Sequence, residues 1–174
     1  MAKSRVLDTL IPTLDELSKI FDTPLNIIET GTIRRSEPEY AVGDGHSTKW
    51  IARWIAKNGG TFYSVDLETA TAYEFLAAKE LLKYVKLVKS SSIAFLEKID
   101  FDVHLAYLDS ANDPVLTKAE FLAVLPHMAT GGRIIVDDYV PDSREKMKGN
   151  LLHPYLVAYK FKFEIKGVQC IIYL

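Results

Sequence analysis

Carboxylates and small polar residues follow several short apolar runs of this chain. In sequence order they are Glu29-Thr30-Gly31-Thr32, Asp66, Ser90-Ser91-Ser92, Asp109 and Asp137-Asp138. Each position has a structural interpretation by itself, because Asp and Ser are good N-caps for a following helix. Ligands of open α/β sheets bind outside the carboxyl ends of the strands, so the whole set favours a ligand-binding crevice.

Glycines accompany the first of these positions. Gly31 follows the first apolar run, and Gly43-Asp44-Gly45-His46-Ser47-Thr48 leads into a helical pattern. Glycine beside a strand end lets a ligand approach the backbone, and a helix N-terminus offers free N–H groups. The dinucleotide fingerprint G-x-G-x-x-G is absent, and an insert at residues 33–42 separates the glycines. Its length predicts a flap, and its Arg34 and Arg35 are either solvated or a site for an anionic substrate group.

The elements that must position these residues follow an alternating pattern. Apolar or β-branched runs predict strands at residues 25–28, 61–65, 85–88, 103–108 and 133–136. Helical spacing predicts helices at residues 48–56, 71–82, 93–99 and 118–125. The strand runs are almost continuously apolar, as in strands covered on both faces. Strand–helix repetition therefore predicts a doubly wound α/β fold with a mostly parallel sheet and helices on both faces.

Both ends of the chain depart from this alternation. Leu14, Leu17 and Ile20 recur at helical spacing, which predicts an amphipathic N-terminal helix that ends before Pro24. After a predicted helix at residues 144–160, two apolar runs at 161–165 and 169–174 are joined by Lys166-Gly167-Val168. A short link that contains glycine predicts a C-terminal antiparallel hairpin.

Composition narrows the class of protein. The 174 residues, 48% hydrophobic and 25% charged, favour one globular domain, with a helix in residues 1–24 and a core in 25–174. The net charge of −2 gives no general attraction for nucleic acid. Cys170 is the one cysteine, which excludes an internal disulfide and fits a reducing, cytoplasmic location. Since no signal peptide or long apolar stretch is evident, we expect no membrane association.

Together these residues resemble the class I S-adenosylmethionine-dependent methyltransferases, over about residues 25–174. Ile28-Glu29-Thr30-Gly31-Thr32 is similar to the family's first motif, Ser64-Val65-Asp66-Leu67 to its second, and Ser90-Ser91-Ser92 to the segment that borders the adenine. Leu108-Asp109-Ser110 and Gly131-Gly132-Arg133-Ile134-Ile135-Val136-Asp137-Asp138 resemble its fourth and fifth strand regions. The resemblance implies a Rossmann-like seven-stranded sheet and S-adenosylmethionine as the cofactor. The residues that it implies for cofactor binding are Glu29, Gly31, Gly45, Ser47, Asp66, Ser91 and Asp109.

A narrower resemblance is to metal-dependent O-methyltransferases of the catechol and macrolide-sugar type. It implies that Asp109, Asp137 and Asp138 hold Mg²⁺, whose preferred ligands are carboxylate oxygens and water. Such an ion would lower the pKa of an acceptor hydroxyl and align it with the donor. Helix capping at a solvent-exposed cleft is the alternative interpretation of these acids.

One departure concerns the general base. The catechol-type enzymes carry a lysine three residues after the first metal-binding Asp, where this chain has Asn112. An asparagine cannot accept the proton, so Asp113 or His46 is a candidate substitute. By their match to the family's positions, Asp109 and Asn112 are the predicted catalytic positions.

The leading hypothesis is a small-molecule O-methyltransferase that binds neither nucleic acid nor membrane, with a homodimer as one possible assembly. Its acceptor would be covered by the N-terminal helix, the insert at 33–42 and a loop at 140–150. The alternative is a non-catalytic or accessory domain that retains the fold and the cofactor site. A nicotinamide-dependent oxidoreductase is disfavoured by the absent fingerprint and by the terminal hairpin.

Overall fold

The computed structural model of the protein describes residues 5–35 and 46–174. Its strands are β1 (Asn26–Thr30), β2 (Thr61–Asp66), β3 (Lys86–Lys89), β4 (Val103–Leu108), β5 (Met128–Val136), β6 (Lys162–Lys166) and β7 (Gln169–Tyr173). Its helices are α1 (Arg5–Ile20), α2 (Ser47–Asn58), α3 (Ala70–Ala78), α4 (Ser92–Leu96), α5 (Pro114–Val124) and α6 (Gly149–Ala158), with short 3-10 turns at Leu82–Tyr84 and Leu125–His127.

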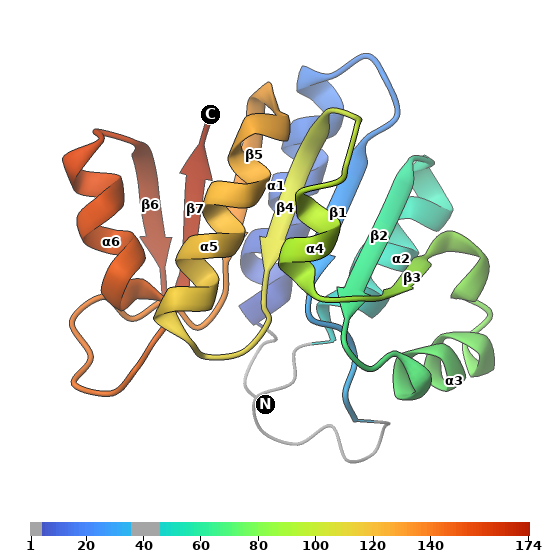
Figure 1. Cartoon of the computed structure of the whole chain (residues 1–174). Coiled ribbons are helices and arrows are strands. Elements are labelled where there is room, and N and C mark those ends of the chain that lie inside the picture. Colours follow the sequence, from blue (N-terminus) through green and yellow to red (C-terminus); the bar gives the residue numbers. More distant parts are fainter. Residues whose placement is uncertain (1–4, 36–45) are drawn as a thin grey trace.

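The strands form one seven-stranded sheet of order β3-β2-β1-β4-β5-β7-β6 in the described part of the chain (Figure 1). Strands β1 to β5 pair in parallel, and β7 pairs antiparallel with both β5 and β6. The predicted fold class and the terminal hairpin are confirmed. The chain runs outward from β1 to β3 and then returns to place β4 beside β1. The boundary between β1 and β4 is thus the switch point at which open α/β sheets bind ligands.

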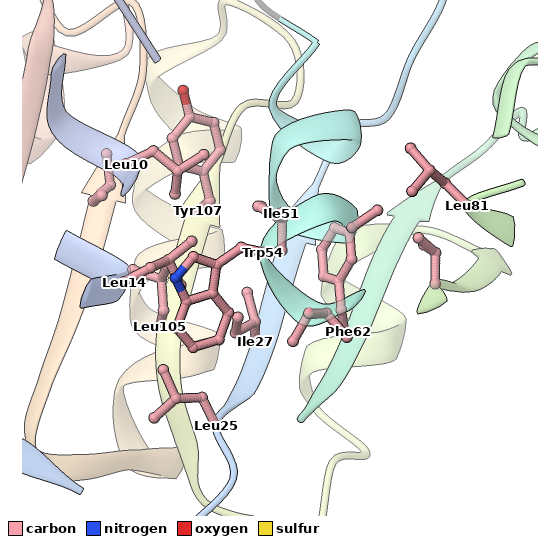
Figure 2. Close-up of a cluster of buried hydrophobic side chains, with 14 of the residues drawn as sticks. Leu10, Leu14, Leu25, Ile27, Ile51, Trp54, Phe62, Leu81, Leu105 and Tyr107 are labelled. Atoms are coloured by element: carbon pink, nitrogen blue, oxygen red, sulfur yellow. The ribbon is translucent and has the colours of Figure 1, made fainter. Parts of the chain in front are cut away.

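Two apolar layers cover the two faces of the sheet. Side chains alternate across a strand, so Ile27 of β1 and Leu105 of β4 face the layer of α1, α2 and α3, whereas Ile28 and Ala106 face α4, α5 and α6. Figure 2 shows the first layer, where side chains of α1 and α2 pack on β1 and β4.

Helix α1 belongs to this core. Leu10, Leu14 and Leu17 are fully buried in the first layer, at the spacing of one helix face. Beside them, the Trp54 indole N–H of α2 donates to an Asp15 carboxylate oxygen at 2.9 Å. The predicted amphipathic helix is confirmed, and it ends at Ile20.

Several element boundaries differ from the sequence prediction. Helix α3 ends at Ala78 instead of residue 82, α4 ends at Leu96 instead of residue 99, and α5 begins at Pro114 instead of residue 118. Strand β5 begins at Met128 instead of residue 133, because the Gly131 N–H pairs with the Leu174 carbonyl at 2.9 Å and extends the ladder. At Gly132 a Cβ atom would approach the carbonyl oxygen of His104 to 3.0 Å, so a residue that normally weakens a strand is required here.

A further difference lies near the C-terminus. Helix α6 begins at Gly149 instead of residue 144, so residues 144–148 extend the loop after β5. Among the residues that are described, no helix has the length and apolarity needed to cross a membrane.

We predict that Leu14→Ala lowers the free energy of unfolding by about 2–5 kcal/mol, because it leaves a cavity between α1 and the sheet. Ile20→Ala is the matched control on the same helix, since Ile20 is 47% exposed, and it should cost less than about 1 kcal/mol. Urea denaturation measures both variants. Equal losses would show that α1 does not share the core of the sheet.

Candidate functional site

A cavity of about 310 Å³ lies at the carboxyl ends of the parallel strands, around the switch point. These ends form the lower edge of the sheet in Figure 1. The lining residues are Gly31, Arg34, Val65, Asp66, Leu67, Ser91, Ser92, Asp109, Ser110, Ala111 and Leu116. Four predicted site residues, Gly31, Asp66, Ser91 and Asp109, are therefore brought together. The volume lies at the lower end of the range for small-molecule sites, roughly 300–1,000 Å³.

The backbone at Gly31 joins the ends of β1 and β4. Its φ is +87°, and a Cβ atom would lie 2.2 Å from the Asp109 carbonyl oxygen. The Gly31 N–H donates to the Val65 carbonyl at 2.9 Å, and the Asp109 N–H donates to the Thr30 carbonyl at 2.9 Å. Glycine is therefore needed at this position for the close approach of the chain to itself.

Asp66 ends β2 at the edge of the cavity. One of its carboxylate oxygens accepts a hydrogen bond from the Thr32 N–H at 3.1 Å, and the other accepts one from the Glu68 N–H at 3.2 Å. These bonds fix the carboxylate and leave further acceptor capacity on both oxygens. Leu67, the next residue, is 71% exposed and adds an apolar wall. A fixed acid beside an apolar wall suits a ligand with a diol next to a flat ring.

Glu29 lies behind the cavity and is fully buried. Ser47 donates to one carboxylate oxygen, and Thr48 and Ser64 each donate to the other at 2.7 Å. Burial raises the pKa of Glu29 to about 7, although the three hydroxyls favour the charged form. Since neither Glu29 nor Ser47 lines the cavity, this arrangement assigns them to holding β1, β2 and the start of α2 together. A direct contact with a cofactor stays a prediction.

The segment between β1 and α2 is described only in part. Gly45 and residues 36–42 of the predicted flap lie outside the described residues. Both Arg34 and Arg35 are exposed, and of the two only Arg34 lines the cavity, as the anion-site interpretation requires.

The acids that follow β4 and β5 bind protein groups. The ammonium of Lys148 is 2.6 Å from one carboxylate oxygen of Asp109. Asp137 accepts hydrogen bonds from the Tyr107 hydroxyl and from the Asp138 N–H, both at 3.0 Å. Burial raises the pKa of Asp109 to about 7; Lys148 opposes this shift, and the negative charge of Asp137 adds to it.

This geometry corrects the predicted magnesium site. Within residues 5–35 and 46–174, no group of three or more Asp, Glu, His or Cys side chains is arranged to hold a metal ion. Asp109 pairs with the ammonium of Lys148, and Asp137 accepts hydrogen bonds from a hydroxyl and a backbone N–H, so two of the three predicted ligands are bonded to protein groups. The donor set therefore does not fit Mg²⁺.

The candidates for a general base also lie away from the cavity lining. Asn112 is exposed, and its neighbour Ala111 lines the cavity instead. Asp113 caps α5, where its carboxylate accepts from the Val115 N–H at 2.8 Å. His46 is 1% exposed, and its ring packs edge-on against Phe75 at 5.0 Å. Of the two predicted catalytic positions, the structure places only Asp109 in the cavity.

Two charged residues that bond to the cavity lining, Glu120 and Lys148, were not found from the sequence. Glu120 is fully buried and accepts a hydrogen bond from Ser110 at 2.9 Å. Its position on α5 between Thr117 and Phe121, on the face that packs against the sheet, was an available signal. Lys148 had no such signal, because it stands in an irregular loop.

Comparisons with known proteins agree with this architecture. A sequence model of a family described as a methyltransferase domain matches residues 41–139 of the 174. No curated protein matches the chain. Many solved structures do.

The structural neighbours are distant in sequence. MycE methyltransferase from the mycinamycin biosynthetic pathway, solved with Mg and SAH, has a TM-score of 0.65 at 14% identity over 92% of this chain. The chain spans 48% of that protein, or about half its length. CalS11, a TDP-rhamnose 3'-O-methyltransferase, has a TM-score of 0.65 at 18% identity, covering 97% of this chain and 80% of its own. An rRNA methylase from Streptococcus thermophilus has a TM-score of 0.58 at 14% identity, covering 91% and 90%. These similarities show the fold.

We predict that Glu29 makes the free energy of unfolding depend on pH. Its pKa is about 7 in the folded chain and near 4.5 when exposed, so the folded state binds more protons between these values. Stability therefore falls as the pH rises from about 4.5 to 7, by up to about 3 kcal/mol relative to Glu29→Gln. Urea denaturation across this pH range measures the difference between the two proteins.

Asp109 contributes in the same direction, but it is present in both proteins and largely cancels from the difference. Glu74→Gln, which removes an exposed carboxylate on α3, is the control and should retain the wild-type pH dependence. A constant difference between wild type and Glu29→Gln at all pH values would contradict the prediction.

Proposed function

The chain belongs to the methyltransferase domain family, and we propose that it transfers the methyl group of S-adenosylmethionine to a hydroxyl of a small molecule. Its fold is that of the class I S-adenosylmethionine-dependent methyltransferases. One observation carries the proposal: the cavity at the switch point, with Asp66 fixed at its edge and the tight Gly31 turn in its wall.

The donor site follows from the lining residues. Asp66 would accept hydrogen bonds from the two ribose hydroxyls, since its carboxylate is held in place by backbone N–H groups. Leu67 and Val65 supply apolar surface for a base, and Ser91 adds a polar group at the start of α4. The bound donor supplies a methyl group on a sulfonium, which is already activated, so the protein contributes mainly by alignment.

The acceptor is assigned to the side of the cavity near Asp109. Asp109 lines the cavity, and its carboxylate pairs with Lys148, which directly precedes α6. Arg34 lies in the wall and offers a planar guanidinium to an anionic group of the acceptor, such as a phosphate. CalS11 is a TDP-rhamnose 3'-O-methyltransferase, and a nucleotide sugar as the acceptor of this chain would use both features.

A small molecule is favoured over nucleic acid as the acceptor. The chain carries 21 basic and 23 acidic residues, so it has no excess of positive charge for a phosphate backbone. Since some structural neighbours are rRNA methylases, RNA is the competing acceptor to test. Metal assistance is left out of the proposal because the donor set does not fit it. The single domain, the homodimer and the cytoplasmic location stay predictions from the sequence.

We predict that Asp66→Asn weakens binding of S-adenosylhomocysteine by about tenfold or more. Hydrogen bonds to a charged acceptor are worth about 1.5–3 kcal/mol, and the substitution removes that charge. Titration calorimetry measures the affinity, with Glu74→Gln as a control that removes an exposed carboxylate from α3. Wild-type affinity in Asp66→Asn would refute the ribose assignment, and no binding by the wild type would refute the donor site.

A transfer assay with methyl-labelled donor decides the acceptor class. Sugar nucleotides, other hydroxylated small molecules and an rRNA fragment are offered separately, and we expect label only in small molecules. For an acceptor that carries a phosphate, Arg34→Ala should raise KM by about tenfold, whereas Arg35→Ala should not. Label in RNA would contradict the proposal. Donor binding without transfer to any class would favour the accessory-domain alternative.

A further inference from the structure

Lys148 is more deeply buried than any other lysine or arginine in the described ranges. It is 1% exposed, and its ammonium lies 2.6 Å from Asp109. It precedes α6, at the end of the orange loop at lower left in Figure 1. Burial of a lysine is costly unless its charge is paired, so this position needs a physical explanation.

The loop before α6 is braced so that Lys148 is held at this place. A Cβ atom on Gly149 would lie 2.8 Å from the backbone nitrogen of Pro141, which shows how tightly the two ends of the loop pack. The Asn150 amide donates to the carbonyls of Pro141 and Ser143 at 3.1 and 3.0 Å, and its oxygen accepts from the Met147 N–H at 2.7 Å. The backbone on either side of Lys148 is therefore fixed by hydrogen bonds.

Two acidic side chains interact with the ammonium of Lys148. Besides Asp109, its positive charge acts on Glu120, which is fully buried on α5. Asp137 and Asp138 in turn act on Asp109 through their negative charges. Acids gathered in this way repel one another unless a cation lies among them. Here that cation is a side chain of the chain itself.

We propose that Lys148 takes the place at these strand ends where the sequence predicts a divalent cation, so that the chain does not bind Mg²⁺ or Mn²⁺ there. The ammonium bonds to a carboxylate oxygen that a metal would need, and its charge repels a second cation from the same acids. Lys148 is a positioning residue: it acts on the cavity through Asp109, whose carboxylate it orients and whose negative charge it balances.

The inference concerns the same strand ends as the proposed function, but its test needs neither donor nor acceptor. Failure of the metal experiment and failure of methyl transfer can therefore be told apart.

The experiment is a titration of the full chain with Mn²⁺, followed by calorimetry and by the electron spin resonance signal of the free ion. We expect no binding that depends on Asp109 in the wild type. Lys148→Met keeps an unbranched side chain of similar length without the charge, and it should bind Mn²⁺ at least about tenfold more tightly than the wild type. Adding Asp109→Asn to Lys148→Met should abolish that gain, which locates the new site.

Two further variants control the measurement. Lys146→Met removes a lysine from the exposed part of the same loop and should behave as the wild type. Lys148→Arg retains the positive charge and should also bind no Mn²⁺. Mn²⁺ binding by the wild type that Asp109→Asn abolishes would overturn the proposal, even if Lys148→Met does not fold. A folded Lys148→Met that gains no affinity for Mn²⁺ would overturn it as well.

Discussion

The backbone of Gly31 lies so close to the carbonyl of Asp109 that no side chain fits between the ends of β1 and β4. A Cβ atom at Gly31 would meet that oxygen at 2.2 Å. The contact places the first loop directly over the fourth strand, and the cavity is bounded by both. Asp66 ends β2, Ser91 follows β3 and Asp109 follows β4. The close turn at Gly31 lets these three strand ends border one cavity.

Two acids beside this turn are stabilised in different ways. The Glu29 carboxylate accepts hydrogen bonds from three hydroxyls, on α2 and β2. These bonds hold the end of β1 to both elements without a positively charged partner. Asp109 faces the cavity on one side and an ammonium on the other, with 25% of its side chain exposed. The first acid is thus built into the scaffold, whereas the second remains in contact with whatever enters the cavity.

The loop between β5 and α6 connects this chemistry to the rest of the fold. Its residues pack through Gly149 and Asn150 onto the segment directly after β5. Because β5 pairs with β4, the loop reaches the Asp109 end of the cavity. Methyl transfer, as proposed here, would depend on this loop for the orientation of Asp109 and on the β2 end for the donor.

The sequence by itself determined the order of the strands and helices, the antiparallel hairpin and the positions of Gly31, Asp66, Ser91 and Asp109 at strand ends. These features follow from local patterns, since apolar periodicity and the residue after each run are properties of a few neighbouring positions. The boundary of β5 was missed because Gly131 and Gly132 are unfavourable in a strand locally, and a contact with His104 makes glycine necessary.

Only the tertiary structure decided what the acids bind. Asp109, Asp137 and Asp138 have the spacing of a metal site in the sequence, yet Lys148 reaches Asp109 from 39 residues further along the chain. Likewise, the buried carboxylate of Glu29 accepts hydrogen bonds from Ser47 and Ser64, which the sequence alone did not pair with it. Each of these outcomes depends on which side chains from distant segments meet after folding. Local patterns carry no information about that, because burial and charge pairing are set by the packing of the whole domain.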